Sequence, residues 1–232
     1  LTTNGILLKE QLPGLMEAGL DALNISLDTL EAENFRRITR RNELDRTLEG
    51  LEAALSYPSL KVKINCVPTF QTDQELLQVA ALARENPLHV RFIEMMPIGL
   101  GKDFTARDEN SVKKILEKKY GILTPVSEIL GNGPCHYYTL EDFKGRIGFI
   151  SALSHKFCNQ CNRVRLTSTG YLKGCLQFEN GVDLKALLRN GASDEILKNA
   201  LQKAIFEKPA GHNFQEKKNG REESHIMSQI GG

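Results

Sequence analysis

The sequence predicts an α/β fold built around a parallel sheet. Three segments rich in β-branched and apolar residues are expected to be strands, at 22–28, 61–67 and 90–96. Stretches with apolar residues at helical spacing separate them, and strands that alternate with helices of about 10–15 residues form βαβ units. The 232 residues are also enough for a substantial hydrophobic core.

The helices of the first part of the chain are expected at four places: 8–18, 30–38, 44–56 and 73–85, the last with Asp73 as its N-cap. Leu1–Gly5 has the pattern of a strand end that runs into a turn. Three complete strands and this stump make neither an eight-stranded barrel nor a doubly wound sheet. The fold is therefore either a small α/β sheet or the back half of a larger one, and the abrupt start at Leu1 favours the second.

From about residue 106 the pattern changes to shorter elements. A helix is expected near 108–119, and strands at 137–140 and 146–150. Residues 163–167 and 171–173 are expected to form a hairpin around the turn Ser168-Thr169-Gly170. Helices are expected near 183–190 and 193–206. This change of pattern divides the chain into predicted domains at 1–105 and 106–232.

Charge and composition limit the function. Lys and Arg total 30 against 29 Asp and Glu, a net charge of +1, which argues against a general binder of nucleic acid or membrane surfaces. No stretch approaches the roughly 18 uncharged apolar residues that span a bilayer. We expect a cytoplasmic, reducing location, where five cysteines are thiols or metal ligands rather than disulfides.

Three cysteines have the spacing of a metal site. Cys158 and Cys161 are two residues apart, so a tight turn can present both sulfurs to one side. Cys175 follows at the far end of the predicted hairpin, which returns it to the pair. Cys66 is expected in the core, and Cys135 receives no role.

The spacing alone leaves the metal open. Zinc would require a fourth ligand in a closed site, for which His155 or His136 is available. An iron–sulfur cluster with three cysteines would leave one iron open to a small molecule. The simplest alternative is that the three cysteines are buried apolar residues.

Two arginines lie between these cysteines. Arg163 and Arg165 would project from the same face of a strand, on either side of Val164. Two adjacent guanidinium groups repel each other unless an anion lies between them, and their geometry suits phosphate. The alternative is a strand edge with solvated arginines. We favour a phosphate site.

These segments closely resemble the MoaA family of GTP 3′,8-cyclases, radical S-adenosylmethionine enzymes of molybdenum cofactor biosynthesis. The resemblance covers essentially the whole chain. It is carried by Cys158–Thr167 and Gly170–Leu176, by Thr2–Gly5, Asn24–Asp28, Lys61–Asn65 and Arg91–Met96, and by the terminal Gly231-Gly232.

The resemblance implies an incomplete (β/α) barrel of the radical SAM type, followed by a C-terminal cluster-binding extension. It implies that Cys158, Cys161 and Cys175 bind an auxiliary 4Fe–4S cluster whose open iron contacts GTP. No catalytic side chain is assigned. The implied GTP contacts are Thr2, Lys63, Arg163, Val164 and Arg165, and the implied S-adenosylmethionine contacts are Ser26 and Met96.

The resemblance further implies a possible homodimer and a product that passes to cyclic pyranopterin monophosphate synthase. One departure matters, because the family's CxxxCxxC motif for the radical-generating 4Fe–4S cluster does not occur in this sequence. We therefore expect an N-terminally truncated chain that alone cannot start the radical reaction. A smaller departure is Pro68–Thr72, where the family usually has a glycine-containing, acidic turn.

Two other functions remain to be weighed. One is a non-catalytic module in which a Cys₃His zinc site holds the hairpin and the arginines bind a nucleotide. The other is a different radical enzyme with an auxiliary cluster, against which the arginine pair and the Gly-Gly end both argue. Iron and zinc analysis would distinguish the zinc module from the iron–sulfur enzyme.

Overall fold

The computed structural model describes residues 1–128 and 130–214, which form two compact units. The first unit combines Leu1–Met95 with Thr105–Ser154. Its elements are β1 (Thr2–Thr3), α1 (Leu8–Glu17), β2 (Ala22–Ser26), α2 (Ala32–Thr39), α3 (Leu44–Leu55), β3 (Lys61–Cys66), α4 (Asp73–Glu85), β4 (His89–Ile93), α5 (Glu109–Tyr120), β5 (Thr124–Val126), β6 (His136–Thr139) and β7 (Arg146–Ile150).

The second unit combines Met96–Phe104 with the described residues from His155 onward. Its elements are η1 (Gly99–Asp103), η2 (Cys158–Gln160), β8 (Arg165–Leu166), β9 (Tyr171–Lys173), β10 (Gly181–Asp183), α6 (Leu184–Arg189) and α7 (Asp194–Phe206). The units divide the chain elsewhere than at residue 105. Compact units alone identify neither a partial barrel nor a cluster-binding extension, so that predicted division stays a prediction.

The first unit is built on a seven-stranded sheet with the order β1-β2-β3-β4-β7-β6-β5. The strands from β1 to β7 in this order are parallel, and β6 and β5 add antiparallel pairs. The predicted α/β class with a parallel sheet is confirmed. Pro125 lies in β5, at the edge of the sheet, where a missing N–H does not interrupt a ladder.

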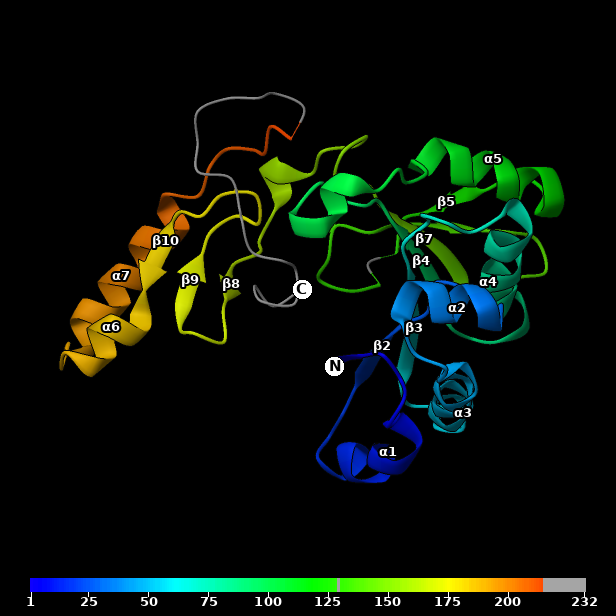
Figure 1. Cartoon of the computed structure of the whole chain (residues 1–232), viewed down its shortest axis with the longest axis horizontal. Helices are drawn as coiled ribbons and strands as arrows, with labels where there is room; N and C mark the ends of the chain where they lie inside the picture. The colour runs from blue at the N-terminus through cyan, green and yellow to red at the C-terminus, as the bar shows by residue number, and fades with distance from the viewer. Residues whose placement is uncertain (129, 215–232) are drawn as a thin grey trace. The chain divides into compact units, whose positions relative to one another are not determined.

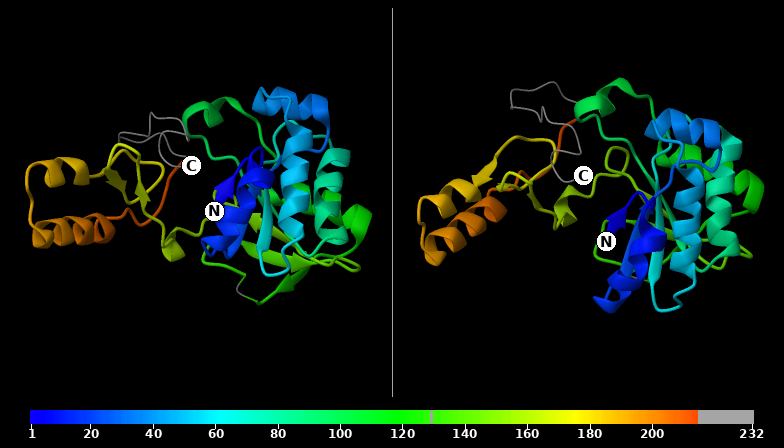
Figure 2. Two further views of the ribbon diagram at one scale, coloured as in Figure 1. Left: turned by 90° about the horizontal axis from the view of Figure 1, so that it is seen from below. Right: turned by 60° about the horizontal axis from the view of Figure 1, so that its bottom comes forward.

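One face of the parallel strands forms the hydrophobic core. Leu23, Ile25 and Ile64 are fully buried, together with Leu76 and Val79 of α4. Figures 1 and 2 show α2, α3 and α4 along one side of these strands. Burying each such side chain contributes about 1.5–3 kcal/mol, so this layer of helices stabilises the sheet.

The opposite face of the same strands is polar. Side chains alternate between the two faces of a strand, and neighbouring strands are parallel. Polar side chains on this face therefore line up in a row across the sheet. Thr2 pairs with Asn24, Asn24 with Lys63, and Lys63 with His89. Two residues further along, Ser26 pairs with Asn65 and Asn65 with Arg91, completing this polar row.

The start of α4 corrects one prediction. Thr72, rather than Asp73, is the N-cap, because its hydroxyl accepts a hydrogen bond from the N–H of Glu75 at 3.2 Å. The Glu75 carboxylate in turn accepts from the N–H of Thr72 at 2.8 Å. This capping box satisfies two backbone donors, which an N-cap at Asp73 would not do.

The second unit contains the three-stranded sheet β10-β9-β8. The predicted hairpin is confirmed as the antiparallel pair of β8 and β9. Its turn requires Gly170, which has φ +83° and lies so close to Lys185 that an added Cβ would be 2.7 Å from the Cβ of Lys185. The predicted helices near 183–190 and 193–206 are α6 and α7.

The strand predicted at 163–167 is shorter than expected. β8 contains only Arg165 and Leu166, so Arg163 precedes the strand. The Lys208 ammonium accounts for the difference, because it donates hydrogen bonds to the carbonyl oxygens of Cys161 and Arg163, both at 2.8 Å. The prediction that Arg163 and Arg165 both lie on this strand and project from its same face is therefore wrong, because only Arg165 belongs to β8.

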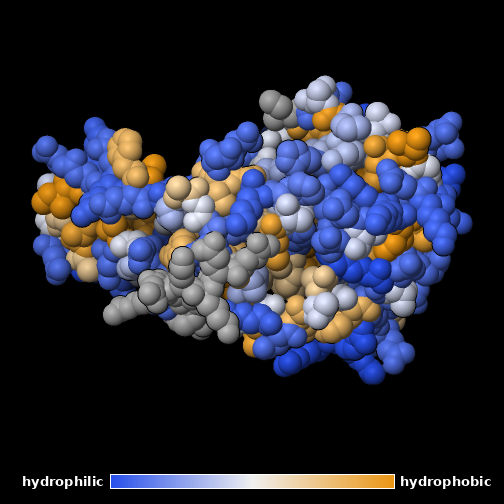
Figure 3. Space-filling view, turned by 90° about the horizontal axis from the view of Figure 1, so that it is seen from above, coloured by the Kyte–Doolittle hydropathy of each residue, from blue (hydrophilic) through white to orange (hydrophobic). Residues whose placement is uncertain are grey.

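The surface is largely hydrophilic in the view of Figure 3. Exposed apolar side chains gather on α6 and α7, at the left of that figure: Leu188, Ile196, Leu201, Ile205 and Phe206. Among the helices that the structure describes, none has the length and apolar character needed to cross a membrane.

Candidate functional site

The first two cysteines of the predicted metal site lie in a tight turn. Cys158 begins the 3₁₀ turn η2, and the N–H of Cys161 donates to the carbonyl oxygen of Cys158 at 3.2 Å. Both side chains are partly exposed, and neither forms a disulfide. The turn thus leaves two thiols accessible within four consecutive residues.

Cys175 follows the end of the hairpin. Arg165 of β8 pairs with Lys173 of β9, so the hairpin returns the chain toward the segment that carries Cys161. The charges of Cys161 and Cys175 both act on the Arg165 guanidinium. The fold therefore brings two of the three cysteines into electrostatic range of the same arginine.

Arg165 is a partly desolvated cation beside a second one. Burial is the main cause that lowers its pKa, followed by the charge of Arg163, while Cys161 and Cys175 act in the opposite direction. Lys173 is almost fully buried, and burial likewise lowers its pKa. Concentrated positive charge at low solvation is a favourable environment for an anionic ligand.

The zinc alternative predicted a closed four-ligand site. In the described ranges 1–128 and 130–214, no three His, Cys, Asp or Glu side chains gather closely enough to hold a single metal ion. His136 lies in β6 of the first unit, whereas the three cysteines belong to the second. His155 belongs to the second unit and precedes Cys158 by three residues.

The other two cysteines lie in the first unit. Cys66 is fully buried in the core, as predicted, and burial raises the pKa of its thiol well above the usual value. Cys135 packs beside Gly148 of β7, and burial raises its pKa to about 11. Both thiols are therefore held in the protonated form near neutral pH.

Lys63 lies on the polar face of the first unit's sheet. Lys63 is only 8% exposed, and its ammonium donates to the carbonyl oxygen of Leu130. Burial lowers the pKa of Lys63, and the charge of Arg91 lowers it further. The pKa of the neighbouring His89 falls to about 4, through burial and then the charges of Lys63, Arg146 and Arg91.

The remaining predicted contact residues have simpler surroundings. Thr2 is exposed at the edge strand, and its hydroxyl accepts from the Asn24 side chain at 3.1 Å. Ser26 is exposed at the end of β2, on the same sheet face as Thr2 and Lys63. Met96 follows β4 and belongs to the second unit, and Val164 is 43% exposed beside Arg165.

The prediction missed a polar network on this face. Arg91 donates to the Asn65 side-chain oxygen at 2.9 and 2.6 Å, and to that of Asn24 at 2.9 Å. Asn24 donates onward to Thr2, so four strands are joined by side-chain hydrogen bonds. The signal was available, since each residue is polar at an alternating position of an otherwise apolar strand.

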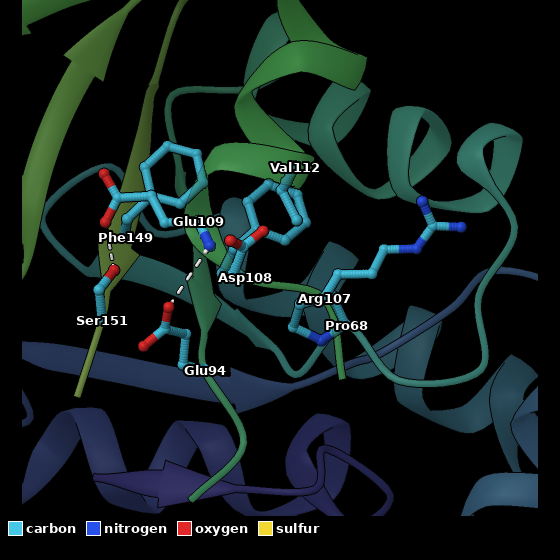
Figure 4. A pocket seen from close by; sticks show the side chains of 9 residues that line it. Pro68, Glu94, Arg107, Asp108, Glu109, Val112, Phe149 and Ser151 are labelled. Carbon is cyan, nitrogen blue, oxygen red and sulfur yellow. Dashed lines mark hydrogen bonds between the residues drawn. The ribbon is translucent and has the colours of Figure 1, made fainter. Parts of the chain in front are cut away.

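The sequence pattern also did not predict the role of the Glu94 carboxylate, which fixes the chain at the end of β7. The Glu94 carboxylate accepts from the N–H groups of Leu153 and Ser154 at 2.8 and 3.0 Å, and from the Ser154 hydroxyl. Figure 4 shows Glu94 pointing toward the N–H of Glu109, and the Ser151 hydroxyl bonded to the Glu109 carboxylate. These bonds hold the last residues before the segment that leads to Cys158.

Comparison with known proteins defines the class and then the family. Residues 1–83 match the Radical SAM superfamily model, and residues 88–214 match the model described as Molybdenum Cofactor Synthesis C. Together with the mostly parallel sheet, these matches define a radical SAM enzyme of molybdenum cofactor biosynthesis. Radical SAM enzymes use a 4Fe–4S cluster and S-adenosylmethionine.

The relatives narrow this class to one family. A GTP 3′,8-cyclase of Clostridium perfringens is 45% identical over 234 residues, which cover 100% of this chain and 72% of the relative. Proteins of the same name from Syntrophomonas wolfei and Moorella thermoacetica are 44% and 42% identical, again over the whole chain and 72% of each relative. The chain belongs to the GTP 3′,8-cyclase family. The predicted family and enzyme class are thus confirmed.

Proposed function

We propose that this chain carries the GTP-binding part of a GTP 3′,8-cyclase. Cys158, Cys161 and Cys175 hold an auxiliary 4Fe–4S cluster beside the bound GTP. The observation that carries the proposal is Arg165, a partly desolvated cation whose pKa is lowered by burial and by the charge of Arg163, and raised by Cys161 and Cys175. A metal-bound thiolate group and an anionic substrate together would offset the cost of this arrangement.

The donor set supports a cluster over a single ion. Three thiols without carboxylates form a soft set, which suits iron–sulfur clusters and zinc. Thiolates of a cluster bind different iron atoms, so they need not converge on one point as the ligands of a single ion must. Radical SAM enzymes, to which this chain belongs, use iron–sulfur chemistry, so we propose the cluster rather than a single ion.

The proposed GTP contacts are cationic or small. Arg163 and Arg165 bind phosphate through paired N–H donors, and Lys63 binds as a point charge. Thr2 supplies a hydroxyl, and the exposed Val164 offers apolar surface between the arginines. Removing Lys63 from water already costs free energy in the free protein, so a bound anion recovers part of that cost.

The same proposal assigns Ser26 and Met96 to S-adenosylmethionine. The Ser26 hydroxyl and the Met96 thioether suit a ligand with both polar and apolar parts. When bound, the family's cluster and S-adenosylmethionine supply the radical chemistry that acts on GTP. The partners that we propose are GTP, a second copy of the chain, and cyclic pyranopterin monophosphate synthase as recipient of the product, all in the cytoplasm.

At the level of architecture, we propose an incomplete (β/α) barrel at residues 1–105 and a cluster-binding extension at 106–232. The parallel order of β1, β2, β3 and β4 supports the first part. The cysteine turn and the hairpin support the second. Gly231 and Gly232, which resemble the family's C-terminal tail, lie outside the described residues.

The experiment is anaerobic reconstitution of the chain with iron and sulfide. We expect a brown protein with about four irons and four sulfides per chain. Cys175→Ala should lose the brown colour and the bound iron, because one of the three ligands is missing. Cys135→Ala is the matched control, since that thiol belongs to the first unit, and it should keep the full iron content.

The alternative is a zinc- and nucleotide-binding module. Its support is the short spacing from His155 to Cys158, which could complete a Cys₃His set. A colourless protein with one zinc per chain, which Cys175→Ala releases, would establish this alternative and overturn the cluster.

A further inference from the structure

The segment that follows α7 lies against the cysteine turn. Lys208 is the first contact: its ammonium donates to the carbonyl oxygens of Cys161 and Arg163, both at 2.8 Å, and lies 3.9 Å from the Cys161 sulfur. One cation therefore fixes the backbone between the second cysteine and the arginine pair.

Lys208 also contacts the chain beside the third cysteine. A Cβ added to Gly174 would lie 2.8 Å from the Lys208 Cγ, so the lysine stem packs tightly on the residue before Cys175. A larger residue at position 174 would displace the lysine. The same side chain thus joins the cysteine turn to the hairpin end.

The residues after Lys208 continue this contact. The backbone N–H of His212 donates to the Cys158 sulfur at 3.5 Å. The N–H of Asn213 donates at 2.8 Å to the side chain of Gln177, a buried residue that follows Cys175 by two positions. Residues 208–213 therefore touch the surroundings of all three cysteines.

We propose that residues 208–213 form a clamp that retains the auxiliary cluster and raises its reduction potential, with Lys208 as the positioning residue. The inference rests on the proposed cluster. Reduction adds negative charge, which the Lys208 cation near the Cys161 sulfur and the N–H group at the Cys158 sulfur both stabilise. Hydrogen bonds to the carbonyls of residues 161 and 163 keep the thiolates in place.

The test compares Lys208→Met with Lys203→Met in the reconstituted chain. Methionine keeps the packing stem of residue 208 but removes its charge and donors. Lys203 is a matched control because it is an exposed lysine of α7 whose ammonium lies 3.8 Å from the Glu207 carboxylate. The readouts are the midpoint potential of the cluster and the rate of iron release to a chelator.

We expect Lys208→Met to have a more negative midpoint potential and to release iron about tenfold faster or more. Lys203→Met should match the parent, and Lys208→Arg should recover much of the potential by restoring a cation. Far-UV circular dichroism checks that the variants are folded.

The two proposals fail in different ways. If the parent chain binds no cluster, the proposed function falls, and the clamp falls with it. If the parent binds its cluster and Lys208→Met has the same potential and iron-release rate, the clamp alone is overturned.

Discussion

At the residue scale, the cations of this chain are informative because they are partly removed from water. Burial lowers the pKa of Lys63 and of Arg165, and in each case a neighbouring arginine lowers it further. Such groups are costly unless an anion or a thiolate compensates them. A bound anion would offset this cost at either residue.

The sequence pattern singled out some of these residues and missed others. Cysteine spacing and the Arg163–Arg165 pair stand out in the sequence, since both are short-range patterns. Arg91 and Lys208 do not stand out, because their partners are 26 to 67 residues away for Arg91 and 45 to 47 residues away for Lys208. Such pairs are created only by the tertiary fold.

One residue-scale prediction concerns pH. His89 has a pKa of about 4 in the folded chain and about 6.5 when unfolded. Between these values the unfolded chain binds a proton that the folded chain does not, so the free energy of unfolding falls as the pH drops from 6.5 to 4. His89→Asn keeps an acceptor for the Arg146 N–H and should reduce this fall.

The measurement is the urea midpoint at several pH values. His136→Asn is the matched control, because His136 is exposed on β6, and it should keep the parent's pH dependence. Equal pH dependence in the parent and in His89→Asn would contradict the account of His89.

At the element scale, periodicity predicted most helices and strands to within a few residues. The exceptions have identifiable side-chain causes. α4 has the predicted bounds, but its N-cap is Thr72 rather than Asp73 because Thr72 and Glu75 form a capping box. β8 is short because Lys208 binds the preceding carbonyls. β4 ends before Glu94, whose carboxylate turns to Leu153 and Ser154. Strand pattern alone carries no information about such contacts.

An element-scale prediction follows for Glu94. Glu94→Gln keeps the size of the side chain but replaces one acceptor oxygen with an NH₂ donor that faces N–H groups of residues 153 and 154. We expect a loss of about 1–3 kcal/mol in the free energy of unfolding, measured by urea denaturation.

The matched control for this variant is Glu85→Gln. Glu85 is the exposed last residue of α4, and its substitution should change stability by less than about 0.5 kcal/mol. If both variants have the same stability as the parent, Glu94 does not hold the end of β7.

At the scale of the whole molecule, the sequence indicated the parallel sheet but not its full extent. β6 and β7 were expected in a separate part, yet β7 pairs in parallel with β4, and β6 follows it in the sheet. Sequence pattern identifies a strand but not its partner, because pairing depends on contacts between distant segments. The family matches over residues 1–83 and 88–214 supply the class that pattern alone left open.

The central claim is that the three-cysteine cluster and the arginine pair form one site for GTP. The most direct measurement is the electron paramagnetic resonance spectrum of the reconstituted, reduced chain with and without GTP. We expect GTP to change the spectrum, and Arg165→Ala to require about 10–100-fold more GTP for the same change, since a charge-assisted bond to phosphate is lost. Arg189→Ala, on α6, should respond like the parent. A cluster whose spectrum is identical at saturating GTP would contradict the account.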